Sequence, residues 1–410
     1  MILMKEVVCC LLRYCAILAG LFAPAAHCHD DDILLGMSTA LSGPLQQMGQ
    51  DIKNGISAYF NRINQEGGIK GHQVRLITKD DGYEPKNTAP NVRELIEEDK
   101  VIAIIGNVGT PTAVVTVPIV NEKKMLFFGA VSGASILRKD PPDRYILNYR
   151  ASYKEEAAAM VNGLVKMGIM PEEIAFFTQR DSYGDAGYDG AVEALDALGF
   201  SNINSLTHGR YTRNTLNVEG AVAELMDSEI EPKAVIIAGG YAPTAKFIRL
   251  ARKEFSNLLF VNLSFVGSYA LLDELGDEAE GIIVTQVVPN FSDDSLPIVD
   301  EYISDLNLYF SELNPDFVSF EGYIIARIMV EALKRVPGEF TSESLIKAMY
   351  SIQDVDIGLG HNISFAKDKT QAIHRIWPSI IRAGHFQSFG WNTEQKSESF
   401  SYSVPAVEGL

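Results

Sequence analysis

Cysteine is almost absent from this 410-residue chain, and the four cysteines that it has all lie near the start. They are Cys9, Cys10, Cys15 and Cys28, so nothing beyond residue 28 can form a disulfide framework or a cysteine-ligated metal site. A chain without cross-links has to be stabilised by a large hydrophobic core. Apolar residues make up 47% of the sequence and charged residues 21%, which is typical of a globular protein, and the length predicts two domains.

Long hydrophobic runs are scarce as well, and the one membrane-seeking stretch begins the sequence. Lys5 precedes an apolar run that Arg13 interrupts, and small residues follow at positions 23, 25 and 26. This order is typical of a secretory signal peptide. The apolar run itself is too short to cross a membrane as a helix. We therefore interpret residues 1–28 as a signal peptide and expect export. Cleavage near Ala26, a lipid anchor at Cys28 and an uncleaved anchor helix stay open as alternatives.

Histidine and positive charge are also in short supply. The formal net charge of −18 argues against binding to nucleic acid or to anionic lipid surfaces, although a local pocket can oppose the global sign. Apart from the pair at the processing site, the histidines lack the spacing of zinc ligands, and we expect neither a metal nor a cofactor. The seven positions are His27, His29, His72, His208, His361, His374 and His385.

What the sequence does contain is a long alternation of strand-like and helix-like segments. Runs such as residues 101–105 and 235–238 are continuously apolar, as in parallel strands that are covered on both faces. Between such runs, apolar residues recur with helical spacing, as over residues 52–63. The pattern predicts an α/β fold with right-handed crossovers. One sheet rarely needs this many units, so we expect two Rossmann-like lobes with parallel sheets.

Three loops at predicted strand ends are candidates for a ligand site, because open α/β sheets bind ligands outside the carboxyl ends of their strands. They cover residues 42–49, 106–112 and 129–133 and are rich in glycine and hydroxyl side chains. Thr110 suits a helix N-cap and Pro111 the first helical position. Ser132 takes a similar place one unit later. Two adjacent helix N-termini can hold a carboxylate, and plain capping without a ligand is the alternative.

Catalytic patterns are weak. The loop at residue 106 lacks the lysine of a P-loop and the glycine spacing of a dinucleotide site, and Ser132 is not in a nucleophile elbow. The acidic pairs at residues 80–81 and 155–156 are interpreted as solvated loop and helix charges. Tyr183 and Tyr241 are expected in loops at strand ends of the second lobe, where they can stack on a ligand. We predict a protein that is not an enzyme, with an exported hydrolase as the remote alternative.

Several short segments together resemble the type I periplasmic solute-binding proteins that serve branched-chain amino acid ABC transporters. They are GMSTALSGP at residues 36–44, INQEGGIKG at 63–71, DD at 80–81 followed by EP at 84–85, IG at 105–106, SYG at 182–184 and GGY at 239–241. The resemblance implies two lobes joined by a three-strand hinge near residues 149–151, 286–290 and 371–375. Lobe I would comprise residues 31–149 and 288–372, lobe II residues 150–287 and 373–384, and residues 385–410 would form a C-terminal tail.

The resemblance also implies a set of ligand-binding residues. Loops of the first lobe would hold the ligand through hydroxyls and backbone groups. A residue that replaces an aromatic side chain of the family would line the pocket. Tyrosines of the second lobe would close over the ligand. The implied positions are Met48, Thr110, Ala130, Ser132, Tyr183, Tyr241, Ser264 and Phe265.

Two departures from the family pattern bear on the ligand. Amino-acid binders carry an acidic residue where this chain has Leu263-Ser264-Phe265, and an unpaired buried ammonium costs roughly 3–5 kcal/mol. A neutral or singly anionic ligand therefore fits better than a zwitterionic amino acid. A disulfide of the family is replaced by Tyr83 and Gly109, and we expect Gly109 to open space beside Thr110 and Phe265 to add an apolar wall.

The resemblance implies capture of a solute. We expect a monomeric periplasmic protein that binds a small organic ligand (a carboxylate, amide, aromatic or branched-chain amino-acid-like molecule) and delivers it to a membrane-embedded ABC permease. A periplasmic sensing module that passes occupancy to a separate signalling protein is the alternative.

Overall fold

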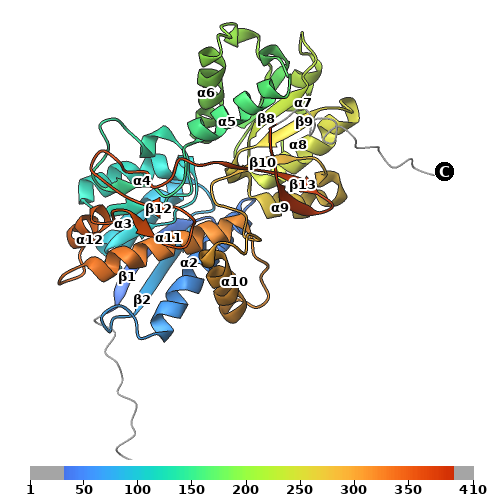
Figure 1. Ribbon diagram of the computed structural model, residues 1–410. Helices are drawn as coiled ribbons and strands as arrows, with labels where there is room; N and C mark the ends of the chain where they lie inside the picture. Colours follow the sequence, from blue (N-terminus) through green and yellow to red (C-terminus); the bar gives the residue numbers. More distant parts are fainter. Residues whose placement is uncertain (1–31, 392–410) are drawn as a thin grey trace, which may run out of the picture. The chain divides into compact units, whose positions relative to one another are not determined.

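The computed structural model describes residues 32–391, and two parallel-rich sheets covered by helices organise this part of the chain (Figure 1). Within these residues, no helix combines the length and the apolar character that a membrane crossing requires. The predicted signal peptide, all four cysteines and residues 392–410 lie outside the described residues.

The first sheet has five parallel strands in the order β2-β1-β3-β4-β5. Its strands are β1 (Ile33–Thr39), β2 (Val74–Asp80), β3 (Ala103–Ile105), β4 (Leu126–Phe128) and β5 (Ile146–Leu147). Its early helices are α2 (Gln46–Gln65), α3 (Pro85–Glu97) and α4 (Thr110–Lys123). Because all strands run the same way, the loops that follow β1, β3 and β4 emerge at one edge of the sheet.

Both faces of this sheet are buried. Leu35 and Ile105 belong to a large cluster of buried side chains, whereas Ile104 belongs to a second cluster with Val92 of α3 and Val117 of α4. Successive residues of a strand point to opposite faces, so the continuous apolar runs feed both clusters.

Later segments return to the first sheet. They are α10 (Pro297–Tyr309), α11 (Phe317–Arg335), α12 (Ser342–Tyr350) and the hairpin strands β11 (Val355–Asp356) and β12 (Asn362–Ile363). Helix α11 lies directly on α2 (Figure 1). A Cβ on Gly55 would come within 1.8 Å of the Ser319 carbonyl oxygen, and one on Gly322 within 2.4 Å of that of Ile52. Only glycine permits this close helix crossing.

The second sheet has seven strands in the order β14-β13-β10-β9-β8-β6-β7, with β13 and β14 antiparallel to their neighbours. The strands are β6 (Ile174–Gln179), β7 (His208–Tyr211), β8 (Ala234–Ala238), β9 (Leu259–Asn262), β10 (Ile283–Gln286), β13 (Trp377–Arg382) and β14 (His385–Ser388). The helices are α5 (Tyr153–Lys166), α6 (Ser182–Ala197), α7 (Glu219–Met226), α8 (Tyr241–Glu254) and α9 (Ser268–Leu275). Short 3-10 turns are η3 (Ser135–Leu137), η4 (Pro171–Glu173), η5 (Ile203–Ser205), η6 (Ser264–Val266) and η7 (Gly276–Ala279).

The chain passes between the two sheets three times: after β5, after β10 and before β13. The first and third passages run side by side. The Asn148 amide donates to the Thr370 carbonyl at 2.7 Å, and the Ile373 amide donates to the Tyr149 carbonyl at 3.1 Å. These positions agree with the three crossings that the family resemblance implies.

The region assigned to a C-terminal tail contains ordered structure. Residues 385–388 form β14, which pairs with β13, so the boundary predicted for lobe II at residue 384 is too early. Trp391 then packs on α5, where a Cβ on Gly163 would lie 2.1 Å from its ring. The strand shows only one buried apolar side chain, Phe386, which is too little periodicity to recognise in a sequence.

Candidate functional site

The loops after β3 and β4 lie side by side, as the sequence predicts. The Gly109 amide donates to the Val131 carbonyl at 3.1 Å, and the Val131 amide donates to the Asn107 carbonyl at 2.9 Å. Gly106 has φ 67° and Gly109 φ 105°, conformations that favour glycine. The glycines of this loop therefore hold the two strand exits together.

Thr110 and Ser132 face each other across these loops. Their hydroxyl oxygens are 2.7 Å apart and both side chains are buried. The predicted role of Thr110 as N-cap is wrong, because Gly109 is the N-cap of α4 and the Thr110 hydroxyl contacts Ser132 instead. The predicted helix after Ser132 is also wrong, since only the three-residue turn η3 follows. Hydroxyl groups, rather than two helix N-termini, therefore characterise this end of the site.

Gly109 does not open space beside Thr110, contrary to expectation. A Cβ at Gly109 would lie 2.1 Å from Cε2 of Tyr83, so the tyrosine ring occupies that volume. Tyr83 is 2% exposed and follows the turn after β2. The two residues that replace the disulfide of the family are thus in contact, with an aromatic ring in place of a covalent bond.

The acidic pair before Tyr83 is only half solvated. Asp81 is buried, and it accepts hydrogen bonds from the Ser38 hydroxyl at 2.8 Å and the Tyr83 amide at 2.9 Å. Burial raises the pKa of Asp81. Interpreting both aspartates as solvated was therefore wrong for Asp81, which anchors the turn that positions Tyr83.

On the side of the second sheet, Tyr183 and Tyr241 lie in helices and not in loops. Tyr183 is the second residue of α6, because Asp181 caps that helix by accepting from the Tyr183 amide at 3.0 Å. Tyr241 is the first residue of α8. The apolar periodicity of these helices begins one to two turns later in the sequence, which is why both tyrosines were expected in loops.

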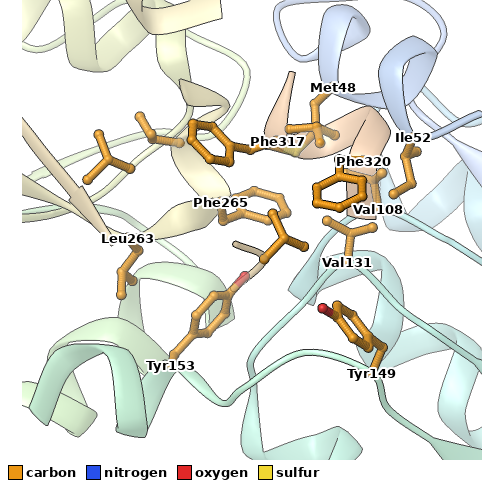
Figure 2. Close-up of a cluster of buried hydrophobic side chains, with 14 of the residues drawn as sticks. Met48, Ile52, Val108, Val131, Tyr149, Tyr153, Leu263, Phe265, Phe317 and Phe320 are labelled. Atoms are coloured by element: carbon orange, nitrogen blue, oxygen red, sulfur yellow. The ribbon is translucent and has the colours of Figure 1, made fainter. Parts of the chain in front are cut away.

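Phe265 lies at the centre of an aromatic cluster (Figure 2). Its ring centroid is 4.6 Å from that of Tyr183, 6.0 Å from that of Tyr83 and 6.5 Å from that of Tyr153. Tyr153 and Tyr183 are 5.3 Å apart. The expected apolar wall at Phe265 is therefore present, and side chains from both sheets build it.

The remaining predicted residues divide into two groups. Met48 lies in the first turn of α2 rather than in a loop, and it meets Tyr241 at Gly267, where a Cβ would be 3.4 Å from both side chains. Ala130 instead packs in the second buried cluster of the first sheet, and its carbonyl accepts from the Ser132 amide at 2.8 Å. Its side chain does not join the other predicted residues.

Sequence reasoning missed a buried ionic group beside Ser264. Arg150 is 1% exposed; its Nη2 donates to the Ser264 hydroxyl, and its Nε lies 3.4 Å from Oε1 of Glu321 on α11. Glu156 accepts from the Ser264 amide at 2.8 Å, the Ser264 hydroxyl at 2.9 Å and the Thr285 hydroxyl at 2.6 Å.

Interpreting Glu156 as a solvated charge was therefore wrong, although the sequence held a signal. Residue 156 falls on the buried stripe of α5, which also contains Tyr153, Ala157 and Met160. Its neighbour Glu155 is half-buried, forms a capping box with Ser152 and accepts a hydrogen bond from Gln371 at 2.9 Å.

Burial and the neighbouring charges change the pKa values of the side chains in this group. Burial raises the pKa of Glu156 and of Glu321, and the Arg150 guanidinium acts against both shifts. Burial alone would lower the pKa of Arg150, but Glu321, Tyr153, Glu156 and Tyr183 together outweigh this effect and the pKa is raised. Burial raises the pKa of Tyr153 to about 12, and the charge of Arg150 acts against that rise.

Several buried polar atoms around this group have no hydrogen-bond partner among residues 32–391. They are Nε and Nη1 of Arg150, Oε1 of Glu321 and the hydroxyl oxygens of Tyr149, Tyr153 and Tyr183. Buried polar groups are normally paired, so a concentration of such atoms is unusual.

Polar contacts also join the two lobes at the outer end of the region where they meet, which we call the seam. Arg213 pairs with Glu84 at 3.1 Å and with Asp181 at 2.7 Å. Asn214 donates to Glu84 at 2.7 Å. A residual cavity of about 10 Å³ remains between Leu45, Tyr83, Gln179 and their neighbours.

A larger cavity of about 980 Å³ lies elsewhere and contains none of the predicted residues. Helix α2, helix α9, the segment between α10 and α11 and the β13–β14 turn line it. Its lining includes six carboxylates, Asp51, Asp273, Asp277, Glu280, Glu312 and Asp316. Within the described residues, however, no group of three or more acidic, histidine or cysteine side chains is arranged to hold a metal ion.

The sequence pattern of a family described as "Periplasmic binding protein" matches residues 32–384. The chain belongs to the periplasmic binding protein family. The resemblance inferred from the short motifs and the two-lobed α/β fold are thereby confirmed. In this family, substrate-binding proteins capture solutes and are not enzymes.

Individual relatives of this periplasmic binding protein carry related names. Leu/Ile/Val-binding protein homolog 7 of Brucella melitensis is 24% identical over 376 residues, which cover 86% of this chain and 89% of the relative. The Leu/Ile/Val-binding protein of Escherichia coli K12 is 26% identical over 274 residues, covering 66% and 72%. A crystal structure of a possible leucine/isoleucine/valine-binding protein from Rhodopirellula baltica SH 1 is 46% identical, with a TM-score of 0.86, and covers 89% of this chain and 98% of that one.

Proposed function

We propose that this periplasmic binding protein captures a small organic ligand between its two lobes and delivers it to a membrane-embedded ABC permease. The observation that carries the proposal is the convergence of buried hydroxyl groups from both sheets at the seam. The Thr110–Ser132 pair comes from loops of the first sheet, and the unpartnered hydroxyls of Tyr153 and Tyr183 come from helices of the second. A ligand with hydrogen-bonding groups would complete this set.

Capture requires the lobes to separate and close again. The residual cavity of about 10 Å³ beside Tyr83 and Gln179 is too small for an organic solute, and the rings of Tyr83, Tyr183 and Phe265 pack against one another in the closed arrangement. A ligand would enter while the lobes are apart and be enclosed by rotation about the three crossing segments. To shift the populations of closed and open forms from 1:99 to 99:1, the ligand must bind the closed form more tightly by about 5.5 kcal/mol. A few charge-assisted hydrogen bonds of roughly 1.5–3 kcal/mol each would supply this difference.

The site favours binding over chemical turnover. The Ser132 hydroxyl contacts the Thr110 hydroxyl, and no histidine of residues 32–391 is hydrogen-bonded to it as a general base would be. The names of the relatives support a small solute related to the branched-chain amino acids. The segment Leu263-Ser264-Phe265 has no acid of its own, and both oxygens of the nearby Glu156 already accept hydrogen bonds, which instead favours a neutral or singly anionic member of that size class.

Native mass spectrometry of the protein as purified tests capture, because a closed binding protein retains its solute. A mass excess that disappears on mild unfolding, followed by calorimetric binding of the identified solute, would support the proposal. A protein that carries no solute and binds none from a metabolite library would contradict it. Uptake of the solute into vesicles containing the cognate permease tests delivery, and the mass of the mature N-terminus tests export through residues 1–28.

A further inference from the structure

Arg150 is a buried cation whose protein surroundings leave it incompletely bonded. One of its nitrogens, Nη2, donates to the Ser264 hydroxyl. Nε faces Glu321 at 3.4 Å without a hydrogen bond, and Nη1 has no acceptor among residues 32–391. A guanidinium presents five N–H donors in a planar fork that matches a carboxylate. A buried fork with free donors therefore indicates that an acceptor from outside the chain completes it.

The neighbouring carboxylates do not use these donors. Glu156 already accepts three hydrogen bonds from Ser264 and Thr285, which satisfy both of its oxygens. Glu321 approaches only Nε, and its Oε1 accepts no hydrogen bond. The end of the guanidinium that carries Nη1 is thus left open although the side chain is 1% exposed.

The guanidinium of Arg150 lies close enough to Tyr149, Tyr153 and Tyr183 to interact electrostatically with each of them. Arg150 stands in the first crossing segment between Tyr149 and Tyr153, and these two tyrosines point their hydroxyl ends toward the middle of the cluster beneath Phe265 (Figure 2). The Tyr153 ring is 5.3 Å from that of Tyr183. Positive charge and hydroxyl donors thus meet next to an aromatic wall.

We propose that Arg150 is the charge partner of the ligand, and that the ligand is a small monocarboxylate without an α-ammonium group. This inference rests on the proposed capture and names its substrate class. The carboxylate would accept from Nη1 of Arg150 and from the hydroxyls of Tyr153 and Tyr183, while the apolar remainder would lie against Phe265. An α-ammonium group would meet the like charge of Arg150 there, because both oxygens of Glu156 already accept hydrogen bonds and Oε1 of Glu321 faces Nε of Arg150.

Matched ligands test this class without any mutation. Calorimetry on the wild-type full chain would compare 4-methylpentanoate, 4-methylpentanamide and leucine, and likewise 3-phenylpropanoate, 3-phenylpropanamide and phenylalanine. Within a set that binds, we expect the carboxylate to bind at least about tenfold more tightly than its amide and its amino acid, because a hydrogen bond to a charged group is lost in each comparison. Preference for an amide or an amino acid overturns the inference and leaves capture intact. Binding of none of the six overturns it too, and the mass spectrum of the purified protein then decides separately whether capture stands.

Variants of Arg150 test the residue. Arg150→Gln should weaken carboxylate binding about 10- to 100-fold and leave amide binding within a factor of about two. Arg150→Lys, which keeps the charge but not the fork, should fall between. A purely structural role would weaken carboxylate and amide equally, and that result overturns the proposal.

Two further variants control for loss of folding and for the general effect of removing an arginine. If Arg150→Gln fails to fold because buried carboxylates lose their partner, the double variant Arg150→Gln/Glu321→Gln removes both members of the pair and should show the same loss of carboxylate preference. Arg327→Gln is the matched control, because Arg327 pairs with Glu301 and Tyr59 away from the seam. It should leave both affinities unchanged.

Discussion

Nε2 of Gln179, at the end of β6, donates a hydrogen bond to the hydroxyl oxygen of Tyr83 at 3.2 Å. The two residues follow strands of different sheets, so this bond joins the lobes at the seam. The orientation of the amide is set from both ends, because its oxygen accepts from the Tyr211 hydroxyl at 3.0 Å and its nitrogen also donates to Asp181 at 2.8 Å. Tyr83 thus meets a donor that is already held in place.

Removing that hydroxyl should loosen the closed arrangement. Tyr83→Phe keeps the ring that fills the space beside Gly109 and removes only the acceptor. We expect ligand affinity to fall by about two- to tenfold, since a neutral hydrogen bond contributes about 0.5–1.5 kcal/mol. Calorimetry with the co-purified solute measures this. Tyr350→Phe, whose hydroxyl donates to the Arg144 carbonyl within the first lobe, is the control and should have no effect. Equal affinities for all three proteins would show that the bond does not contribute to closure.

Thr110→Val should weaken binding without unfolding the protein. Valine has nearly the shape of threonine but cannot contact the Ser132 hydroxyl or a ligand oxygen. We expect a loss of about 1 kcal/mol or more in binding free energy, roughly a fivefold change in the dissociation constant, with the unfolding transition nearly unchanged. Thr116→Val on the same helix is the control, because the Thr116 hydroxyl donates to the Thr112 carbonyl and not to the site. If both variants bind as the wild type does, Thr110 is not part of the site.

Gly109→Ala should destabilise the fold through a clash and not only through backbone strain. The new Cβ would lie 2.1 Å from the Tyr83 ring, at a residue with φ 105°. Gly199→Ala is the matched control, with φ 85° and no heavy atom within 4 Å of the added carbon. We expect urea denaturation to show a free energy of unfolding lower by about 1–3 kcal/mol for the first variant than for the second. Equal losses would mean that the Tyr83 ring moves aside at no cost.

Stability should fall as pH rises through the range in which Asp51 titrates. Burial and the nearby Asp316 raise the pKa of Asp51 from its ordinary 3.8 to about 8. Between these values the folded protein holds a proton that the unfolded chain has released, so the free energy of unfolding decreases toward alkaline pH, by at most about 1.4 kcal/mol per unit. Urea denaturation at pH 5, 6.5 and 8 should show a shallower decrease for Asp51→Asn.

Asp80→Asn is the contrasting variant for that titration. Burial alone would raise the pKa of Asp80, but hydrogen bonds from Ser42 and from the Leu41 and Gly82 amides outweigh it and lower the pKa. Its stabilising effect is therefore complete above pH 5 and is lost only as the pH falls below the ordinary value of 3.8. The free energy of unfolding of this variant should differ from that of the wild type by the same amount at all three pH values. A wild-type stability that is flat between pH 5 and 8 would contradict the assignment to Asp51.

Motifs and periodicity predicted the class of fold and the order of most elements, and the family resemblance implied the three crossings. The continuous runs at β3 and β8 are buried on both faces, and helix α2 carries the expected apolar stripe. The antiparallel β14 and the polar β7 were not predicted, because short strands with only one or two buried side chains show little periodicity in the sequence. Their place is decided by pairing with strands far away in the sequence.

The candidate site was predictable only in part. Local sequence placed Thr110 and Ser132 on adjacent loops, and the two hydroxyls are in contact. Nothing local showed that Glu156 faces Ser264, which lies 108 positions away, or that Glu321 approaches Arg150 from α11. Such partners meet only when both sheets are assembled.

The amino-acid sequence by itself determined the α/β class, the family and the glycine-rich strand exits, because these depend on local periodicity and on short motifs. The tertiary structure alone decided that Tyr83 fills the space beside Gly109 and that a buried arginine stands at the seam. Packing and charge pairing act between residues that are distant along the chain, and local patterns carry no record of which residues will be neighbours.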